Sequence, residues 1–460
     1  MIVAVALAGC ASPSTPSSPE AAPTPALPPP NIVVVMTDDL DVPTTGELPR
    51  IGQLMADRGL SFTRAFVALP ICGPSRASLF TGQYGHNHGV IANAHPYGGF
   101  TYFRRHESAT IATWLHDAGY RTALVGKYMN DYPHEAAAQY IPPGWDEWYG
   151  HLAAFEDDKF YNYYINDNGT VVWHGADPED YSTDDVARRS VEIIRESADR
   201  TEPLFLYIAT EAPHRPATYA ARHGSEFRGA VAPRVPSFNE PDISDKPYGV
   251  RLRPMTPAEI DWLDTLQRWR LRSMRPVEEL INGVIQALAE TGRLGNTFLF
   301  FTSDNGLLMG QHRIIANKRS CYEEAIRVPL VVRGPGVPAG TADAMVSFID
   351  LAPTFLDLAG APIPASVDGR SFASVLRGTT PESWPNEIIV EYYAAALTAT
   401  LRTPEWAYIE DQTGEVELYD MKSDPWETES LHWDADPALL EELHQRLREL
   451  LRCQGASCRS

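Results

Sequence analysis

Apolar residues follow two alternating patterns along the chain. Short continuous runs, rich in β-branched and aromatic residues, occur at residues 31–36, 122–126, 203–209, 296–301 and 328–334. Runs of this kind are typical of strands that are buried on both faces. Between them, residues 108–120 and 275–292 carry apolar residues at helical spacing. The alternation predicts an α/β fold with a parallel sheet that is covered by helices.

The pattern changes at about residue 362. Residues 387–393, 400–410 and 415–427 have the character of antiparallel strands, and residues 436–453 form a closing amphipathic helix. We therefore expect a main domain over residues 31–361 and a smaller subdomain over residues 362–460 that shares its core. Within the main domain, Asn168-Gly169 predicts a hairpin turn. Asn168-Gly169-Thr170 also matches the N-glycosylation sequon, so glycosylation is the alternative role for Asn168.

The N-terminal residues resemble an export signal. Residues 1–10 are a short apolar run that ends in "LAGC", similar to the lipobox of a bacterial lipoprotein, in which Cys10 is lipidated. Residues 11–30 are rich in Pro, Ser and Ala and predict an extended tether. We expect an exported lipoprotein, anchored at the outer side of the cell membrane or periplasmic. Its only expected contact with the membrane is the lipid.

Charge and cysteine content narrow the possible partners. The net charge of −22 excludes a nucleic-acid-binding protein of the usual basic kind, and any anionic substrate needs a local basic pocket. Of the five cysteines, Cys453 and Cys458 are close enough in sequence to close a small loop. Cys72 and Cys321 remain, and the sequence leaves open whether they pair.

Polar residues follow each predicted strand at its carboxyl end. They are Asp38 and Asp39, Lys127, His214, and Asp304 with Asn305. Ligands of open α/β sheets bind at this edge, so these residues should lie together. Three carboxylates and an amide oxygen suit Ca²⁺, with Mg²⁺ as the alternative. The competing interpretation is that these residues serve only turns and helix caps.

The segment "CGPSRASLFTG", residues 72–82, resembles the signature of type I sulfatases, in which a cysteine is oxidised to formylglycine. The resemblance extends through "TDDL", "GKYMNDY", "APHRP", "TSDNG", "NKRSCYEEAIRVPLVVRGPG" and "IDLAPTFLDLAG". It implies an alkaline-phosphatase-like fold with a large mixed, mostly parallel sheet. "HNHGV", "GKYMNDY", "GWDEWYG" and "CQGASCR" are most similar to the N-acetylglucosamine-6-sulfatase branch.

The resemblance also implies roles for individual residues. Cys72, converted to formylglycine by a formylglycine-generating enzyme, would supply the nucleophile for a sulfate ester. The cation would be held by Asp38, Asp39, Asp304, Asn305 and the modified Cys72. Arg76 would stabilise the ionised hydroxyl, Lys127 and Lys318 would bind the sulfate oxygens, and His214 would protonate the leaving oxygen.

Other residues carry weaker expectations. Asn130 takes the place that a histidine has in many other sulfatases, and with His86 and His312 it is a candidate for substrate binding. For His86 and its neighbour His88, packing or hydrogen bonding near the pocket is the alternative, and metal binding is not expected. The arginines of residues 268–275 are expected on a solvated helix face. Cys321 is expected to be an unreactive thiol.

The sequence therefore predicts a sulfatase that acts on a sulfated sugar of the glucosamine-6-sulfate type. Two alternatives remain. One is a phosphatase or phosphodiesterase of the alkaline-phosphatase-like superfamily, which would use Thr or Ser where this chain has Cys72. The other is a catalytically silent lipoprotein that binds sulfated glycans.

Overall fold

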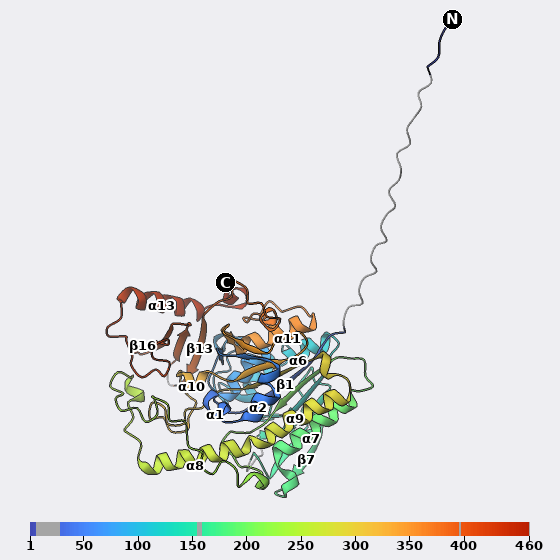
Figure 1. The fold of residues 1–460 in the computed structure, drawn as a ribbon. Helices are drawn as coiled ribbons and strands as arrows, with labels where there is room; N and C mark the ends of the chain where they lie inside the picture. Colours follow the sequence, from blue (N-terminus) through green and yellow to red (C-terminus); the bar gives the residue numbers. More distant parts are fainter. Residues whose placement is uncertain (6–27, 154–158, 395–396, 460) are drawn as a thin grey trace.

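The computed structural model describes residues 1–5, 28–153, 159–394 and 397–459 of the chain (Figure 1). Cys10 and most of the predicted tether lie outside the described residues. Among the residues that are described, no helix has both the length and the apolar character needed to cross a membrane.

The core of the molecule is a ten-stranded mixed sheet with the strand order β11-β2-β10-β9-β1-β8-β4-β5-β6-β7. Its central strands β9, β1, β8, β4 and β5 are all parallel. The predicted α/β fold with a large, mostly parallel sheet is confirmed. The strands are β1 (Asn31–Thr37), β2 (Leu60–Phe62), β4 (Arg121–Gly126), β5 (Glu147–His151), β6 (Tyr163–Asp167), β7 (Thr170–His174), β8 (Leu204–Ala209), β9 (Thr297–Ser303), β10 (Leu330–Arg333) and β11 (Gly340–Ala342).

Two details of the sheet refine the sequence-based interpretation. The run at 328–334 contains β10, which pairs antiparallel with β9 and so does not extend the parallel part of the sheet. Asn168 and Gly169 join β6 to β7, and both have positive φ (47° and 88°), as a tight hairpin turn requires.

Helices cover both faces of the sheet and give three layers. On one face α3 (Cys72–Thr81), α6 (Ile111–Asp117) and α11 (Leu351–Ala359) pack on alternate residues of β1, such as Ile32 and Val34. On the other face α2 (Pro49–Leu54), α7 (Ser182–Glu196) and α9 (Arg275–Glu290) pack on Val33 and Val35. Figure 1 shows α7 and α9 side by side across this second face. Burial on both faces explains why the strand sequence is continuously apolar.

A second sheet of four antiparallel strands follows in the C-terminal part, with the order β13-β14-β15-β16. Its strands are β13 (Ile388–Tyr393), β14 (Leu397–Arg402), β15 (Trp406–Asp411) and β16 (Val416–Asp420), and α13 (Pro437–Leu450) packs on it. Ile388, Ile409 and Tyr419 belong to the same hydrophobic cluster as residues of the main sheet. A disulfide joins Cys453 and Cys458 after α13.

Short elements complete the chain. A two-stranded sheet pairs β3 (Ala65–Phe66) with β12 (Val346–Ser347). The remaining α-helices are α1 (Val42–Gly46), α4 (Gly85–His88), α5 (Gly99–Phe103), α8 (Pro257–Ser273), α10 (Glu323–Ile326) and α12 (Ala373–Leu376).

Candidate active site

The carboxyl ends of the parallel strands bring the predicted polar residues to one edge of the sheet. Register between β1 and β9 pairs Thr37 with Ser303, so the residues that follow these strands are neighbours. The backbone N–H of Asp39 donates to Asp304 Oδ1 at 3.3 Å. The Asn305 side-chain amide donates to Asp39 Oδ1 at 2.7 Å. Two segments that are far apart in sequence thus form one carboxylate cluster.

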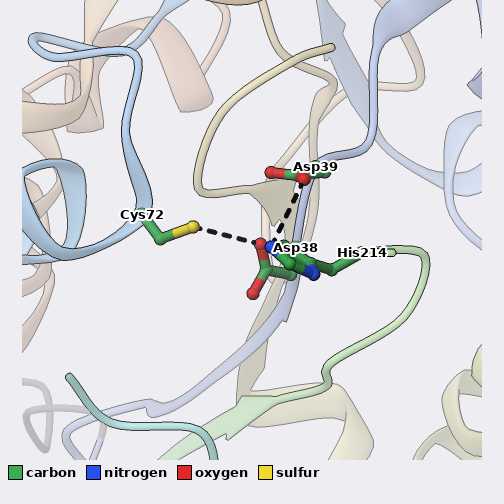
Figure 2. A group of neighbouring side chains, drawn as sticks. All are labelled: Asp38, Asp39, Cys72 and His214. Carbon is green, nitrogen blue, oxygen red and sulfur yellow. Dashed lines mark hydrogen bonds and ion pairs between the residues drawn. The ribbon is translucent and has the colours of Figure 1, made fainter. Parts of the chain in front are cut away.

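Cys72 is the first residue of α3, and its thiol points into this cluster (Figure 2). Cys72 Sγ lies 3.3 Å from Asp38 Oδ1 and also contacts the Lys318 ammonium group. Burial, with the charge of Asp38, raises the pKa of the thiol to about 12. An unmodified thiol here would stay protonated at neutral pH, which is the opposite of a reactive cysteine.

Arg76 lies one turn further along α3 and is fully buried. Its guanidinium binds Asp304 Oδ2 through Nε and Nη2, both at 2.9 Å, and donates to the Lys127 carbonyl at 2.9 Å. The arginine therefore ties α3 to the ends of β9 and β4. Burial and the charge of Asp38 raise the pKa of Asp304 to about 6, although Arg76 opposes the shift.

Two lysines neutralise the aspartates. Lys127 binds Asp38, and Lys318 binds Asp39. Burial alone would lower the pKa of each lysine, but the neighbouring carboxylates outweigh burial and raise both pKa values. Both side chains are therefore charged at neutral pH and can pair with an anion.

The aspartate cluster fits a hard cation. Ligand atoms of Asp38, Asp39, Cys72 and His214 all lie within 4.8 Å of one another. Asn305 Oδ1 is buried and has no hydrogen-bond partner among the described residues. An orphaned amide oxygen beside two carboxylates is the donor that a Ca²⁺ or Mg²⁺ ion would satisfy.

His214 faces this cluster from the loop after β8 (Figure 2). Its Nε2 lies 3.7 Å from Asp39 Oδ2, and its Nδ1 is paired with the Arg215 carbonyl at 2.6 Å. The carbonyl can only accept, so Nδ1 carries hydrogen and Nε2 is the atom that can gain or lose a proton at the site. Burial lowers the pKa of the ring, although Asp39 opposes the shift.

Comparison with known protein families identifies the family to which this chain and its site belong. The sulfatase family profile matches residues 30–361. The chain belongs to the sulfatase family. A second profile, described as the C-terminal part of N-sulphoglucosamine sulphohydrolase, matches residues 310–453. This chain is therefore a sulfuric ester hydrolase.

Two relatives show how far the similarity extends. Human N-acetylglucosamine-6-sulfatase is 34% identical over 94% of this chain and 86% of its own length. The N-acetylglucosamine-6-O-sulfatase of Bacteroides thetaiotaomicron is 26% identical, over 97% and 89% of the two chains.

Solved structures confirm the fold of this sulfatase. One, described as a complex with its substrate D-glucosamine-2-N,6-O-disulfate, has a TM-score of 0.79 at 24% identity and covers 94% of this chain and 98% of its own. A phosphonate monoester hydrolase from Silicibacter pomeroyi has a TM-score of 0.75, also at 24% identity, with 93% and 96% covered. Both show the fold alone, and the second shows that one fold serves sulfatases and phosphonate hydrolases.

The site of this sulfatase contains charged residues that sequence reasoning missed. Glu211 is almost completely buried, with its carboxylate 3.5 Å from Lys127 and 3.4 Å from Lys159. Burial would raise the pKa of Glu211, but Lys127 and Lys159 lower it to about 2. Glu211 follows the end of β8, so the strand-end rule that indicated His214 could have found it.

Two asparagines, Asn93 and Asn130, lie against the segment that begins α3. Asn93 Oδ1 accepts from the Gly73 backbone N–H at 2.9 Å. Asn130 Oδ1 is buried without a hydrogen-bond partner among the described residues, and it lies 3.2 Å from the position that a Cβ at Gly73 would take. A side chain at Gly73 would therefore press on both asparagines. The structure places Asn130 at the N-terminus of α3, beside the residue that follows Cys72.

The prediction for the arginines of residues 268–275 was wrong for two of them. Arg270 is fully buried and Arg272 is 9% exposed. Arg270 binds the Asp41 carboxylate and the Asp39 carbonyl, so it holds the backbone that carries the aspartates. No sequence signal separated Arg270 from its neighbours, because its partner is far away in the chain.

The structure places two predicted substrate-binding histidines in other contacts. His86 pairs with Glu391 at 2.9 Å through Nδ1 and with the Cys453 carbonyl at 3.0 Å through Nε2, so both ring nitrogens are occupied. His88 is buried and pairs with the Ser78 hydroxyl at 3.0 Å. His312 is completely buried and pairs with Glu240 at 2.8 Å. These contacts favour packing and hydrogen bonding over contact with a substrate.

Cys321 does not pair with Cys72, since both thiols are free in the structure. Cys321 Sγ contacts the Thr398 carbonyl at 3.7 Å. It lines a cavity of about 470 Å³ between residues 247–250 and the C-terminal sheet. Burial raises the pKa of its thiol to about 12, which favours the predicted unreactive thiol.

Proposed function

We propose that this sulfatase hydrolyses the 6-O-sulfate of a glucosamine-type sugar, with formylglycine at position 72 and a bound Ca²⁺ ion. One observation carries the proposal. Cys72, the first residue of α3 and of the sequence C-x-P-S-R, has its side chain in a cluster with Asp38, Asp39 and Lys318. Support for the sugar comes from the two relatives named as glucosamine-6-sulfatases and from their coverage of nearly the whole chain.

Two groups would supply the chemistry at this site. Hydrated formylglycine would supply an oxygen nucleophile for sulfur, and a divalent cation would supply Lewis-acid polarisation of a sulfate oxygen. Asp38, Asp39, Asp304 and Asn305 would hold the cation. The oxygen-rich donor set favours Ca²⁺ over Mg²⁺, which keeps more of its water.

The chain's own residues would bind and orient the sulfate. Lys127 and Lys318 are charged, buried and directed at the aspartates next to Cys72, so they can bind sulfate oxygens as charge builds on them. Arg76 keeps Asp304 in place and adds positive charge beside residue 72. Removal of one preorganised donor of this kind typically costs ~10²–10³ in rate.

His214 would deliver a proton to the leaving alkoxide. Its Nδ1 is hydrogen-bonded to a backbone carbonyl, which directs Nε2 to the site. A sugar alkoxide is a poor leaving group, so protonation by imidazole contributes strongly to its departure.

Peptide mass spectrometry across residue 72 tests this function. We expect the mass of formylglycine in protein made by a host that contains a formylglycine-generating enzyme, and sulfatase activity in proportion to the converted fraction. Fully active protein that retains an unmodified Cys72 throughout would refute the proposal. In the same samples, release of sulfate from glucosamine 6-sulfate should exceed release of phosphate from the matching phosphate ester. The reverse would favour the phosphatase alternative.

The N-terminal export signal remains part of the proposal. Cys10, if lipidated, would anchor the enzyme at the outer side of the membrane, where environmental sulfated sugars are met. Metabolic labelling with a fatty acid should mark the wild-type chain and not Cys10→Ser.

A further inference from the structure

A second cluster of charged side chains is buried where the loop after β9 meets the C-terminal sheet. Its members are His312 on that loop, Glu324 on α10, and Glu427, which follows β16. One ligand atom from each of the three lies within 4.8 Å of the others. None belongs to the group around Cys72.

Each of these side chains has a buried polar atom without a partner. Among the described residues, His312 Nε2, Glu324 Oε2 and Glu427 Oε1 have no hydrogen-bond partner. The three residues are 0%, 5% and 0% exposed. Buried polar atoms are nearly always paired, so three orphaned atoms on the side chains of one cluster indicate a ligand there.

His312 is oriented in the way that metal-binding histidines are. Its Nδ1 is paired with Glu240 Oε2 at 2.8 Å, and its ring stacks on Tyr322 with centroids 4.1 Å apart. A carboxylate on one ring nitrogen fixes the tautomer and leaves the other nitrogen free to bind a metal. Here the free atom is Nε2, 3.9 Å from Glu324 Oε2.

The buried charges around the cluster also favour a bound cation. Buried carboxyl groups outnumber the buried basic side chains around them: Glu240, Glu323, Glu324, Glu417 and Glu427 against Lys246, Arg313 and Arg402. Arg402 is taken by Glu323, and Lys246 lies against the Glu427 backbone carbonyl. A bound divalent cation would balance the excess of buried carboxyl groups.

We propose that His312, Glu324 and Glu427 bind a divalent transition-metal ion of the zinc class, at a site separate from the catalytic centre. One imidazole and two carboxylates suit Zn²⁺ and its neighbours, unlike the all-oxygen set around Asp38. Two atoms bonded to one ion at ~2.1 Å lie at most ~4.2 Å apart, and the Nε2–Oε2 distance of 3.9 Å is within this limit. This proposal does not depend on the proposed substrate.

The ion would connect two parts of the molecule. His312 precedes Lys318 on the loop that enters the active site, whereas Glu427 comes from the C-terminal subdomain. A shared ion would hold that loop against the subdomain and so support the position of Lys318. A surface cavity of about 570 Å³ is lined by Glu240, which pairs with His312, and by Thr428, which follows Glu427 in sequence.

Metal analysis of the full chain, without an affinity tag, tests the proposal. The protein is stripped with a chelator, loaded with Zn²⁺ in the presence of excess Ca²⁺, desalted and measured by elemental mass spectrometry. We expect one zinc per chain in the wild type, and the same in Asp304→Ala, whose catalytic site is damaged. Loading with Co²⁺ should give visible absorption bands of a site with one nitrogen ligand. No retained Zn²⁺ in the wild type would overturn the proposal.

Two matched variants assign the residues. Glu427→Gln should weaken Zn²⁺ binding by more than ~10-fold. Glu417→Gln is the control, because Glu417 is also buried but is held by the Tyr322 and Tyr419 hydroxyl groups, and it should bind zinc normally. Equal binding by both variants would refute the ligand assignment. If Glu427→Gln does not fold, the deciding measurement is the Tm of the wild type at saturating Ca²⁺: added Zn²⁺ should raise it further, and no rise would refute the proposal.

Discussion

At the scale of single residues, the site is organised by hydrogen bonds that leave one atom of each group available. Asn305 uses its amide N–H on Asp39 and leaves Oδ1 without a partner. His214 uses Nδ1 on a carbonyl and leaves Nε2 facing the aspartates. These pairings predict which atom would meet a cation and which would meet the leaving oxygen.

The leaving group separates proton delivery from sulfate binding at His214. We expect His214→Ala to lower kcat on a sugar 6-sulfate by ~10²–10⁴-fold, because a sugar alkoxide needs a proton in order to leave. Nitrophenyl sulfate expels a stable phenolate, so its hydrolysis should fall far less. Steady-state kinetics on both substrates measures the difference. Equal losses would mean that His214 binds sulfate and does not act as the acid.

The pH dependence follows from the same residue. A general acid must be protonated, and burial holds the pKa of His214 below its usual value of 6.5. Hydrolysis of the sugar sulfate should therefore fall as pH rises through that lowered pKa. The falling limb should be weak for nitrophenyl sulfate and absent in His214→Ala. A limb that persists in the variant would point to another group.

At the scale of elements, the site depends on helix α8, which carries no residue of the predicted catalytic set. Arg270 of α8 is the buried partner of Asp41 and of the Asp39 carbonyl, while the half-buried Arg268 on the same helix binds the Ala230 carbonyl. An ion pair of this kind is costly to break because the remaining charge stays buried.

Replacement of each arginine by methionine tests this difference. Arg270→Met should lower the free energy of unfolding by ~3–5 kcal/mol, since Asp41 loses its partner. Arg268→Met is the matched control and should cost less than ~1 kcal/mol. Urea unfolding followed by circular dichroism measures both values. Similar losses for the two variants would contradict the importance of the Asp41 pair.

At the scale of the whole molecule, the C-terminal sheet and the main sheet share one hydrophobic core. Ile388, Ile409 and Tyr419 from the small sheet lie in the same cluster as Phe300 and Phe355. The two parts therefore resemble one domain in their packing, although the strand pattern along the chain separates them.

Truncation tests the shared core. A chain that ends at residue 361 would expose the apolar residues that the small sheet covers, so we expect it to aggregate or to lose near-UV circular dichroism. Analytical size exclusion and limited proteolysis, with the full chain as the control, measure the outcome. A monomeric, protease-resistant truncated chain would show that the main domain folds by itself.

The fold class and the residues at the strand ends could be predicted from the amino-acid sequence. The periodicity of strands and helices is local, and parallel strands bring the residues that directly follow them, such as Asp38, Lys127 and Asp304, to one edge of the sheet. The motif around Cys72 also indicated the family from the sequence, because its residues are neighbours along the chain.

The partners of the buried side chains could be identified only from the folded structure. Arg270 looked like a surface residue because its partner, Asp41, is remote in sequence. His312 is a site candidate because the resemblance to sulfatases places a histidine near the site, and the structure buries it among Glu240, Glu324 and Tyr322. Local patterns report which face of an element is apolar, whereas the pairing of buried charges depends on contacts between segments that meet only when the chain has folded.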